Sequence, residues 1–260
     1  MKTNVTIILL IALAVCNFAT AFPGPQTGKQ DFPIYDSMFY KGKPDTKPDG
    51  LIASNILYEK KIWPNRQNAG TLPNQEEFKA LVRATIPDPG PLVIDIESLP
   101  LRGTPEAARH NTEILSKLAD WAHEAAPGKV VGYNGTNTLS NVPPPNQAFA
   151  KELASHVDAF FPSLYTFDDN REGWEKRAQA AQAEARALDT KKPIYFFLWP
   201  QYHQGTARAL RYLNSDYWKF ELETARRYSN GIVLWGPSGY FWDAKSGWWA
   251  ATQEFAKSLH

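Results

Sequence analysis

Asp95 and Glu97 stand one residue apart at the end of an apolar run that begins at Leu92. The apolar residues predict a strand of a parallel sheet, buried on both faces. Successive side chains of a strand point to opposite faces, so the two acids share a face, with Cβ atoms about 6.5–7 Å apart. In α/β barrels the reacting groups lie at the carboxyl ends of the strands, where these acids fall. We therefore predict a catalytic pair; the structural alternative is that one acid caps the following loop and the other pairs with a surface cation.

Apolar and amphipathic segments alternate through the rest of the chain, a pattern typical of folds built from β/α units. The apolar segments predict seven strands, at 34–40, 56–60, 92–98, 130–134, 159–165, 193–199 and 231–236. Helices are expected near 75–82, 104–125, 146–156, 171–188, 215–228 and 246–258. We predict an α/β fold, a single TIM-like (β/α) barrel of seven parallel strands, with a doubly wound open sheet as the alternative.

The carboxyl ends of the strands would meet at one mouth of such a barrel. Besides the two acids, those ends carry Tyr40, Tyr58 or Glu59, Tyr133 with Asn134, Tyr165, Trp199 and Trp235. Carboxyl groups transfer protons, aromatic faces hold sugar rings, and tyrosine hydroxyls place polar substituents. The combination predicts a sugar-cleaving pocket that uses no cofactor. Its substrate-binding residues are expected to be Tyr58, Tyr133, Trp199 and Trp235.

Metal and serine chemistry have little support in the sequence. The five histidines never fall at His-x-x-x-His spacing, and they are His110, His123, His156, His203 and His260. Cys16 is the only cysteine, so we predict no zinc or other metal site. No Gly-x-Ser-x-Gly motif is present. Asp168 and Asp169 precede Asn170 and a predicted helix, so we interpret them as an N-terminal cap.

The first 21 residues have the pattern of a secretory signal peptide, with Lys2, an apolar core over 8–15 and a small-residue site at 19–21. We expect 22–33 to be a flexible lead-in and 34–260 to be the barrel. Removing Lys2 with the signal leaves 27 basic and 27 acidic residues, which favours neither nucleic acid nor membrane surfaces as partners. A secreted monomer, extracellular or periplasmic, is the prediction.

Four segments carry a resemblance to a known family. They are 55–64, beginning Asn-Ile-Leu-Tyr-Glu; 93–97, Val-Ile-Asp-Ile-Glu; 161–165, Phe-Pro-Ser-Leu-Tyr; and 231–236, Gly-Ile-Val-Leu-Trp-Gly. In this order they resemble strand motifs of the hyaluronidases, the family 56 glycoside hydrolases, and more distantly the family 18 chitinases. Ile96 stands where the hyaluronidases usually have Trp. The resemblance implies a seven-stranded barrel and a polysaccharide or oligosaccharide substrate.

The resemblance further implies a retaining endo-glycosidase in which the N-acetyl oxygen of the substrate attacks the anomeric carbon. Glu97 would protonate the leaving oxygen and then activate water, while Asp95 would orient the acetamido group. Tyr165 would hydrogen-bond the acetamido oxygen, Tyr133 would line the same subsite, and Trp235 would form its floor. The glycan could be hyaluronan, chondroitin or another polymer with N-acetylhexosamine.

Two other functions remain open at this stage. One is a barrel that binds glycans without cleaving them, although the presence of both acids weighs against it. The other is a glycosidase with a direct carboxylate nucleophile, Glu59 or Asp36, acting on glycans that lack an acetamido group.

Overall fold

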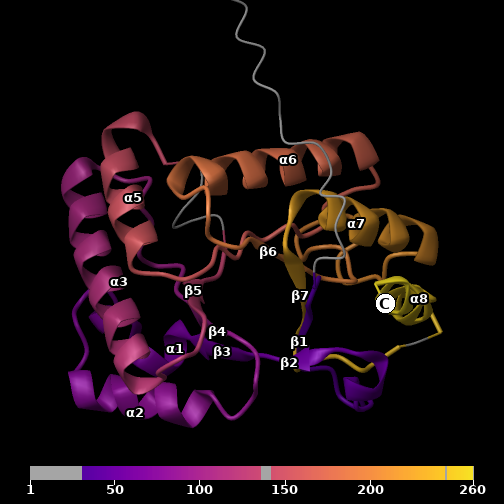
Figure 1. Cartoon of the computed structure of the whole chain (residues 1–260), viewed down its shortest axis with the longest axis horizontal. Coiled ribbons are helices and arrows are strands. Elements are labelled where there is room, and N and C mark those ends of the chain that lie inside the picture. The colour runs from indigo at the N-terminus through magenta and orange to yellow at the C-terminus, as the bar shows by residue number, and fades with distance from the viewer. Residues whose placement is uncertain (1–30, 136–141, 244, 260) are drawn as a thin grey trace, which may run out of the picture.

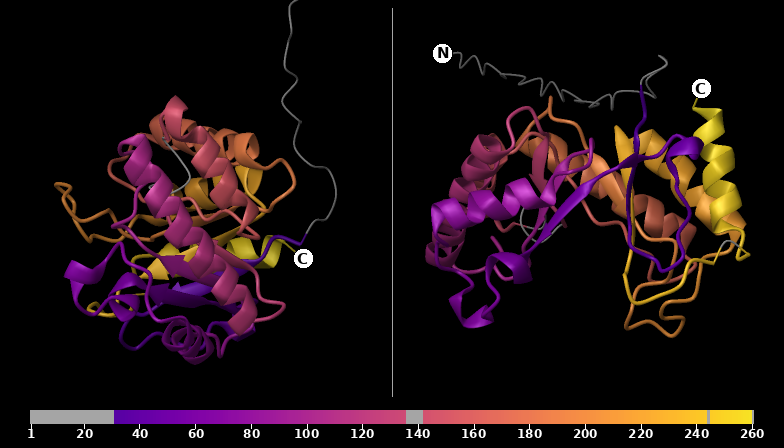
Figure 2. Two further views of the ribbon diagram at one scale, coloured as in Figure 1. Left: turned by 90° about the vertical axis from the view of Figure 1, so that its left-hand side faces the viewer. Right: turned by 90° about the horizontal axis from the view of Figure 1, so that it is seen from below.

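The computed structural model describes residues 31–135, 142–243 and 245–259. Figure 1 shows helices placed around a central group of strands, with α2 (Gln75–Thr85), α3 (Pro105–Ala125) and α5 (Gln147–Ser155) together on one side. On the other side lie α7 (Ser215–Tyr228) and α8 (Trp248–Ser258), and α6 (Arg171–Leu188) runs across the top of the same view. The right-hand view of Figure 2 shows the same division from below. The predicted signal peptide lies outside the described residues.

All ladders between the described strands are parallel, and they form two sheets. The strands are β1 (Ile34–Met38), β2 (Ile52–Ala53), β3 (Asn55–Tyr58), β4 (Leu92–Asp95), β5 (Val131–Tyr133), β6 (Tyr195–Leu198) and β7 (Gly231–Gly236). One sheet has the order β2-β1-β7-β6 and the other the order β3-β4-β5. The short helix α1 (Glu59–Ile62) follows β3 directly. A parallel α/β architecture is therefore confirmed.

The predicted strand at 159–165 is instead a series of isolated bridges between β5 and β6. Phe161 bridges to Asn134 on the β5 side, and Ser163 bridges to Phe197 on the β6 side. Pro162 lies between them and has no N–H to donate, which interrupts a regular ladder at this point. On the far side, β2 and β3 are separated by Ser54 alone.

The strands alternate between an inner face, directed at the other strands, and an outer face, directed at the helices. An inner cluster is formed by Ile56, Val93, Ala159, Phe161, Phe197 and Val233. The alternate residues Leu92, Ile94 and Ile96 belong to the larger core that includes the helices. This alternation is the expected two-residue period of a strand. Two residues beyond Val93, the same period directs Asp95 inward.

No helix in the described part of the chain is both long and apolar enough to cross a membrane.

Gly132 marks the tightest approach in the inner cluster. A Cβ atom there would lie 2.5 Å from the Ala159 carbonyl oxygen and 2.6 Å from the Phe161 ring. Both neighbours are buried, so neither can move aside cheaply. The glycine therefore lets β5 and the segment after Asp158 pack together.

We expect Gly132→Ala to lower the free energy of unfolding by at least about 2 kcal/mol, because it forces a methyl group into a filled space. Urea denaturation measures the change. Gly239→Ala is the matched control, since no atom lies within 4 Å of a Cβ built there. Equal stability of the two variants would contradict the packing described for Gly132.

Candidate active site

A pocket of about 300 Å³ opens at the carboxyl ends of the strands. Both acids reach it, together with residues that follow β5, residues of β7, and residues at and after 163, 199 and 236. Its lining consists of Asp95, Ile96, Glu97, Asn134, Gly135, Ser163, Tyr165, Trp199, His203, Gln204, Leu210, Trp235, Pro237 and Tyr240. The volume is at the lower end of the range for small-molecule sites.

A hydrogen-bond chain holds Asp95 in place. The Asn134 amide donates to Asp95 Oδ1 over 3.1 Å, and Ser163 Oγ donates to Asn134 Oδ1 over 3.1 Å. The three side chains come from β4, the end of β5 and the bridged segment after it. The position of the carboxylate thus depends on the register of neighbouring strands.

The electrostatic surroundings of Asp95 favour its protonated form. Burial, the largest cause, raises the pKa of Asp95 from 3.8 to about 6, and the charges of Glu97 and Glu59 act in the same direction. The hydrogen bond from Asn134 acts against them and lowers this pKa. Asp95 therefore changes ionisation near pH 6, in the range where a proton-handling group is useful.

Three aromatic side chains form a wall of the pocket. The ring centroid of Tyr165 lies 5.6 Å from that of Trp199 and 5.8 Å from that of Trp235, and the two tryptophans are 4.9 Å apart. Trp235 Nε1 donates to the Tyr58 hydroxyl over 3.2 Å. Burial raises the pKa of Tyr165, which keeps its hydroxyl protonated as a donor. Such a wall suits a ligand with an apolar ring face and polar edges.

Glu59 is a third acid, and it supports the backbone of Glu97. Its Oε2 atom accepts hydrogen bonds from the Glu97 amide at 2.9 Å and the Ser98 amide at 3.3 Å. The contact joins the start of α1 to the segment after β4. Glu97 itself is exposed, so these bonds fix its main chain where side-chain packing is sparse.

The structure brings together most of the residues that the sequence singled out. Asp95, Glu97, Tyr165, Trp199 and Trp235 all line the pocket. Tyr58 lies behind the wall and contacts the pocket through its bond with Trp235.

The prediction that Tyr133 lines the pocket is wrong. Tyr133 is fully buried in the core against the helices, and its hydroxyl donates to the Leu115 carbonyl over 2.6 Å. The reason is the two-residue period of β5, which turns Asn134 inward and therefore Tyr133 outward.

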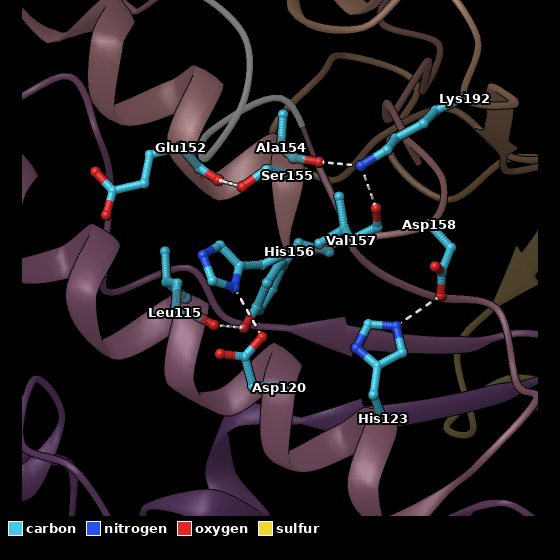
Figure 3. Close-up of polar contacts among 11 residues, drawn as sticks. Leu115, Asp120, His123, Glu152, Ala154, Ser155, His156, Val157, Asp158 and Lys192 are labelled. Carbon is cyan, nitrogen blue, oxygen red and sulfur yellow. Dashed lines mark hydrogen bonds and ion pairs between the residues drawn. The ribbon is translucent and has the colours of Figure 1, made fainter.

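Two of the five histidines form hydrogen-bonded pairs with aspartates in the helix layer. Figure 3 shows His156 against Asp120 and His123 against Asp158, each at 2.7 Å. These pairs connect α3 with the segment after α5, in the helix layer. Across 31–135, 142–243 and 245–259, no group of three or more His, Cys, Asp or Glu residues could hold a metal ion.

Asp36, considered above as a possible nucleophile, has a structural role. Asp36 is buried, and its carboxylate accepts hydrogen bonds from the Met38 amide at 2.9 Å and from Lys43 and Thr46 at 2.5 Å each. It faces away from the inner cluster, as its place in β1 requires.

The prediction that Asp168 and Asp169 cap the start of α6 is wrong. The N-cap is Asn170, whose side chain accepts a hydrogen bond from the Gly173 amide.

Sequence reasoning missed the pocket residues that come from loops. His203, Gln204 and Leu210 follow β6, and Pro237 and Tyr240 follow β7. Loops carry no periodic pattern, so their side-chain directions had no signal. Ser163 did have one, since it lies two residues before Tyr165 on the bridged segment.

No protein-family model and no curated protein sequence matches this chain. Among solved structures, bee venom hyaluronidase aligns over 88% of this chain and 97% of its own, with a TM-score of 0.62 and 14% identity. A structure of bee venom hyaluronidase with a hyaluronic acid tetramer has the same TM-score at 16% identity, covering 88% and 96% of the two chains. A family 18 chitinase from Pseudoalteromonas aurantia has a TM-score of 0.50 at 13% identity, covering 80% of this chain and 78% of its own. The predicted resemblance to these two families is confirmed, and at such identities it is a likeness of fold.

The raised pKa of Asp95 has a consequence for stability. Because its folded-state value of about 6 lies above the ordinary 3.8, the folded protein binds this proton more tightly than the unfolded chain. The contribution of Asp95 to stability therefore falls as pH rises through this interval. We expect Asp95→Asn to raise the free energy of unfolding by about 2–3 kcal/mol at pH 8 and by little at pH 4.

Urea denaturation at the two pH values tests this expectation. The exposed Asp31, changed to Asn, is the control and should show no such difference between the two conditions. A loss of stability at pH 8 in Asp95→Asn would show that the carboxylate is held in its ionised form instead.

Proposed function

We propose that this protein is a secreted glycoside hydrolase that cleaves a glycan next to an N-acetylhexosamine. The reaction retains the anomeric configuration, and the N-acetyl oxygen of the substrate acts as the nucleophile. One observation carries the proposal: Asp95 and Glu97 enter a single pocket beside Tyr165 and Trp235. The shared fold supports it, since the solved relatives include a hyaluronidase and a chitinase. Secretion rests on the signal-like pattern of residues 1–21.

Glu97 carries the proton transfers of this reaction. The Glu97 carboxyl group donates its proton to the glycosidic oxygen as the bond to the anomeric carbon breaks. The acetamido oxygen of the same sugar forms a bond to that carbon, giving a cyclic oxazolinium ion. The resulting Glu97 carboxylate then takes a proton from a water molecule as the water oxygen bonds to the anomeric carbon. The bond between that carbon and the acetamido oxygen breaks, which regenerates the acetamido group and gives a product with the starting configuration.

The remaining residues position the sugar. The Asp95 carboxylate, which a hydrogen bond from Asn134 holds in place, accepts the acetamido N–H. It also stabilises the positive charge that develops on the oxazolinium ring. The Tyr165 hydroxyl donates to the acetamido oxygen, and the Trp235 ring supports the apolar face of the sugar.

We also infer that the two sheets close into one barrel. The segment around 160–163 bridges β5 to β6, and the chain passes from β2 to β3 through Ser54. Closure explains why residues from both sheets meet in the same pocket, as they do at the mouth of a (β/α) barrel.

The direct test is Glu97→Gln. Removing a general acid costs about 100-fold to 10,000-fold in rate, and we expect a loss of kcat in this range on a glycan panel of chitin, chondroitin and hyaluronan oligosaccharides. Glu113→Gln, an exposed change on α3, is the matched control and should keep full activity. Undiminished hydrolysis by Glu97→Gln would refute the proposal, and glycan binding without product in the parent protein would indicate a binding barrel.

Glu59 separates the proposed mechanism from one with an enzyme nucleophile. Its carboxylate is occupied by two backbone amides, so we expect Glu59→Gln, which keeps an acceptor oxygen, to lose at most about tenfold in kcat. Inhibition by an N-acetylglucosamine thiazoline, a mimic of the oxazolinium ion, should be strong. Loss of all activity in Glu59→Gln together with indifference to the thiazoline would assign the nucleophile to Glu59.

A further inference from the structure

We propose that Phe167 and His203 form a second sugar-binding subsite, in which the sugar next to the one in the pocket stacks on the Phe167 ring. The inference rests on the proposed function, because it assumes that a glycan chain occupies the pocket. Its ligand is therefore an oligosaccharide of more than one unit, and the subsite is where the chain leaves the pocket.

Aromatic rings lead without a break from the inside of the pocket to the surface. Tyr165 stacks on His203 with centroids 6.0 Å apart and an interplanar angle of 23°. The centroid of His203 lies 4.9 Å from that of Phe167. His203 lines the pocket, whereas the side chain of Phe167 is 47% exposed just beyond it. The surface thus continues the wall on which the first sugar rests.

Phe167 is held in place by the residues around it. Thr166 is fully buried, its hydroxyl donates to Glu221, and its carbonyl accepts from the His203 amide over 2.7 Å. From α6, the Arg177 guanidinium lies 5.2 Å from the centroid of the Phe167 ring. A platform fixed in this way loses little conformational entropy when a ligand binds, which favours a preformed site.

The pocket itself offers little room for a chain. A volume of about 300 Å³ is at the lower limit for a ligand site, so further units of a polysaccharide must lie outside it. Phe167 is one of several large apolar side chains that are exposed, and its contact with His203, which lines the pocket, sets it apart from the others. A sugar face is a partner that suits such a ring and its aromatic neighbours. The exposed ring and the small pocket thus have one explanation.

The test compares a ligand that fills only the pocket with one that extends beyond it. Titration calorimetry on the Glu97→Gln protein, which holds glycans without cleaving them, measures the affinity for a chitin hexasaccharide and for the N-acetylglucosamine thiazoline. We expect Phe167→Ala to weaken the hexasaccharide about 3-fold to 10-fold and to leave the thiazoline unchanged. Phe167→Tyr, which keeps the ring, should bind both ligands as before.

Phe149→Ala is the matched control. Phe149 also carries an arginine over its ring, with Arg109 at 5.7 Å, but it is on α5 and outside the pocket lining. Its loss should change neither affinity. An unchanged hexasaccharide affinity in Phe167→Ala, or an equal loss for both ligands, would overturn the subsite alone. If neither the hexasaccharide nor the thiazoline bound to the Glu97→Gln protein with Phe167 unchanged, the proposed function and the subsite would be overturned together.

Discussion

Side chains two residues apart on a strand point the same way, and this constraint arranges the pocket. Val93 lies in the inner cluster, so Asp95 follows it inward, and Val233 does the same for Trp235. The apolar residue of each pair packs between the strands, and the functional residue stands above it at the carboxyl end. The same burial that stabilises the centre of the fold therefore also positions the chemistry.

The pocket has an electrostatic cost that the surrounding hydrogen bonds offset in part. A buried carboxylate loses hydration, and two further acids close to Asp95 repel its charge. Asn134 compensates with a hydrogen bond to the carboxylate, and Ser163 orients Asn134. The Glu59 carboxylate accepts hydrogen bonds from the backbone amides of Glu97 and Ser98. Asp95 is thus held through its side chain by Asn134, whereas Glu97 is held through its backbone by Glu59.

The sequence predicts side-chain directions correctly where the two-residue period of a strand applies, and it does not predict them in the loops. The apolar runs predicted β1, β4, β6 and β7, and the spacing of Asp95 and Glu97 placed both acids in one pocket. The prediction for Tyr133 is wrong because consecutive residues of a strand face opposite ways: Asn134 points into the pocket, and Tyr133 therefore points to the helices. The strand at 159–165 was over-predicted because Pro162 breaks its ladder. His203 and Tyr240 belong to loops, whose directions depend on tertiary contacts that no local pattern encodes.

In the proposed reaction, Asp95 and Glu97 act together on a sugar whose own acetamido group supplies the nucleophile. Hydrolysis of a chitin oligosaccharide compared with its fully de-N-acetylated form, under identical conditions, measures this most directly. We expect cleavage of the acetylated glycan and none of the deacetylated one, because only the former can form the cyclic intermediate. Cleavage of both at similar rates would contradict it.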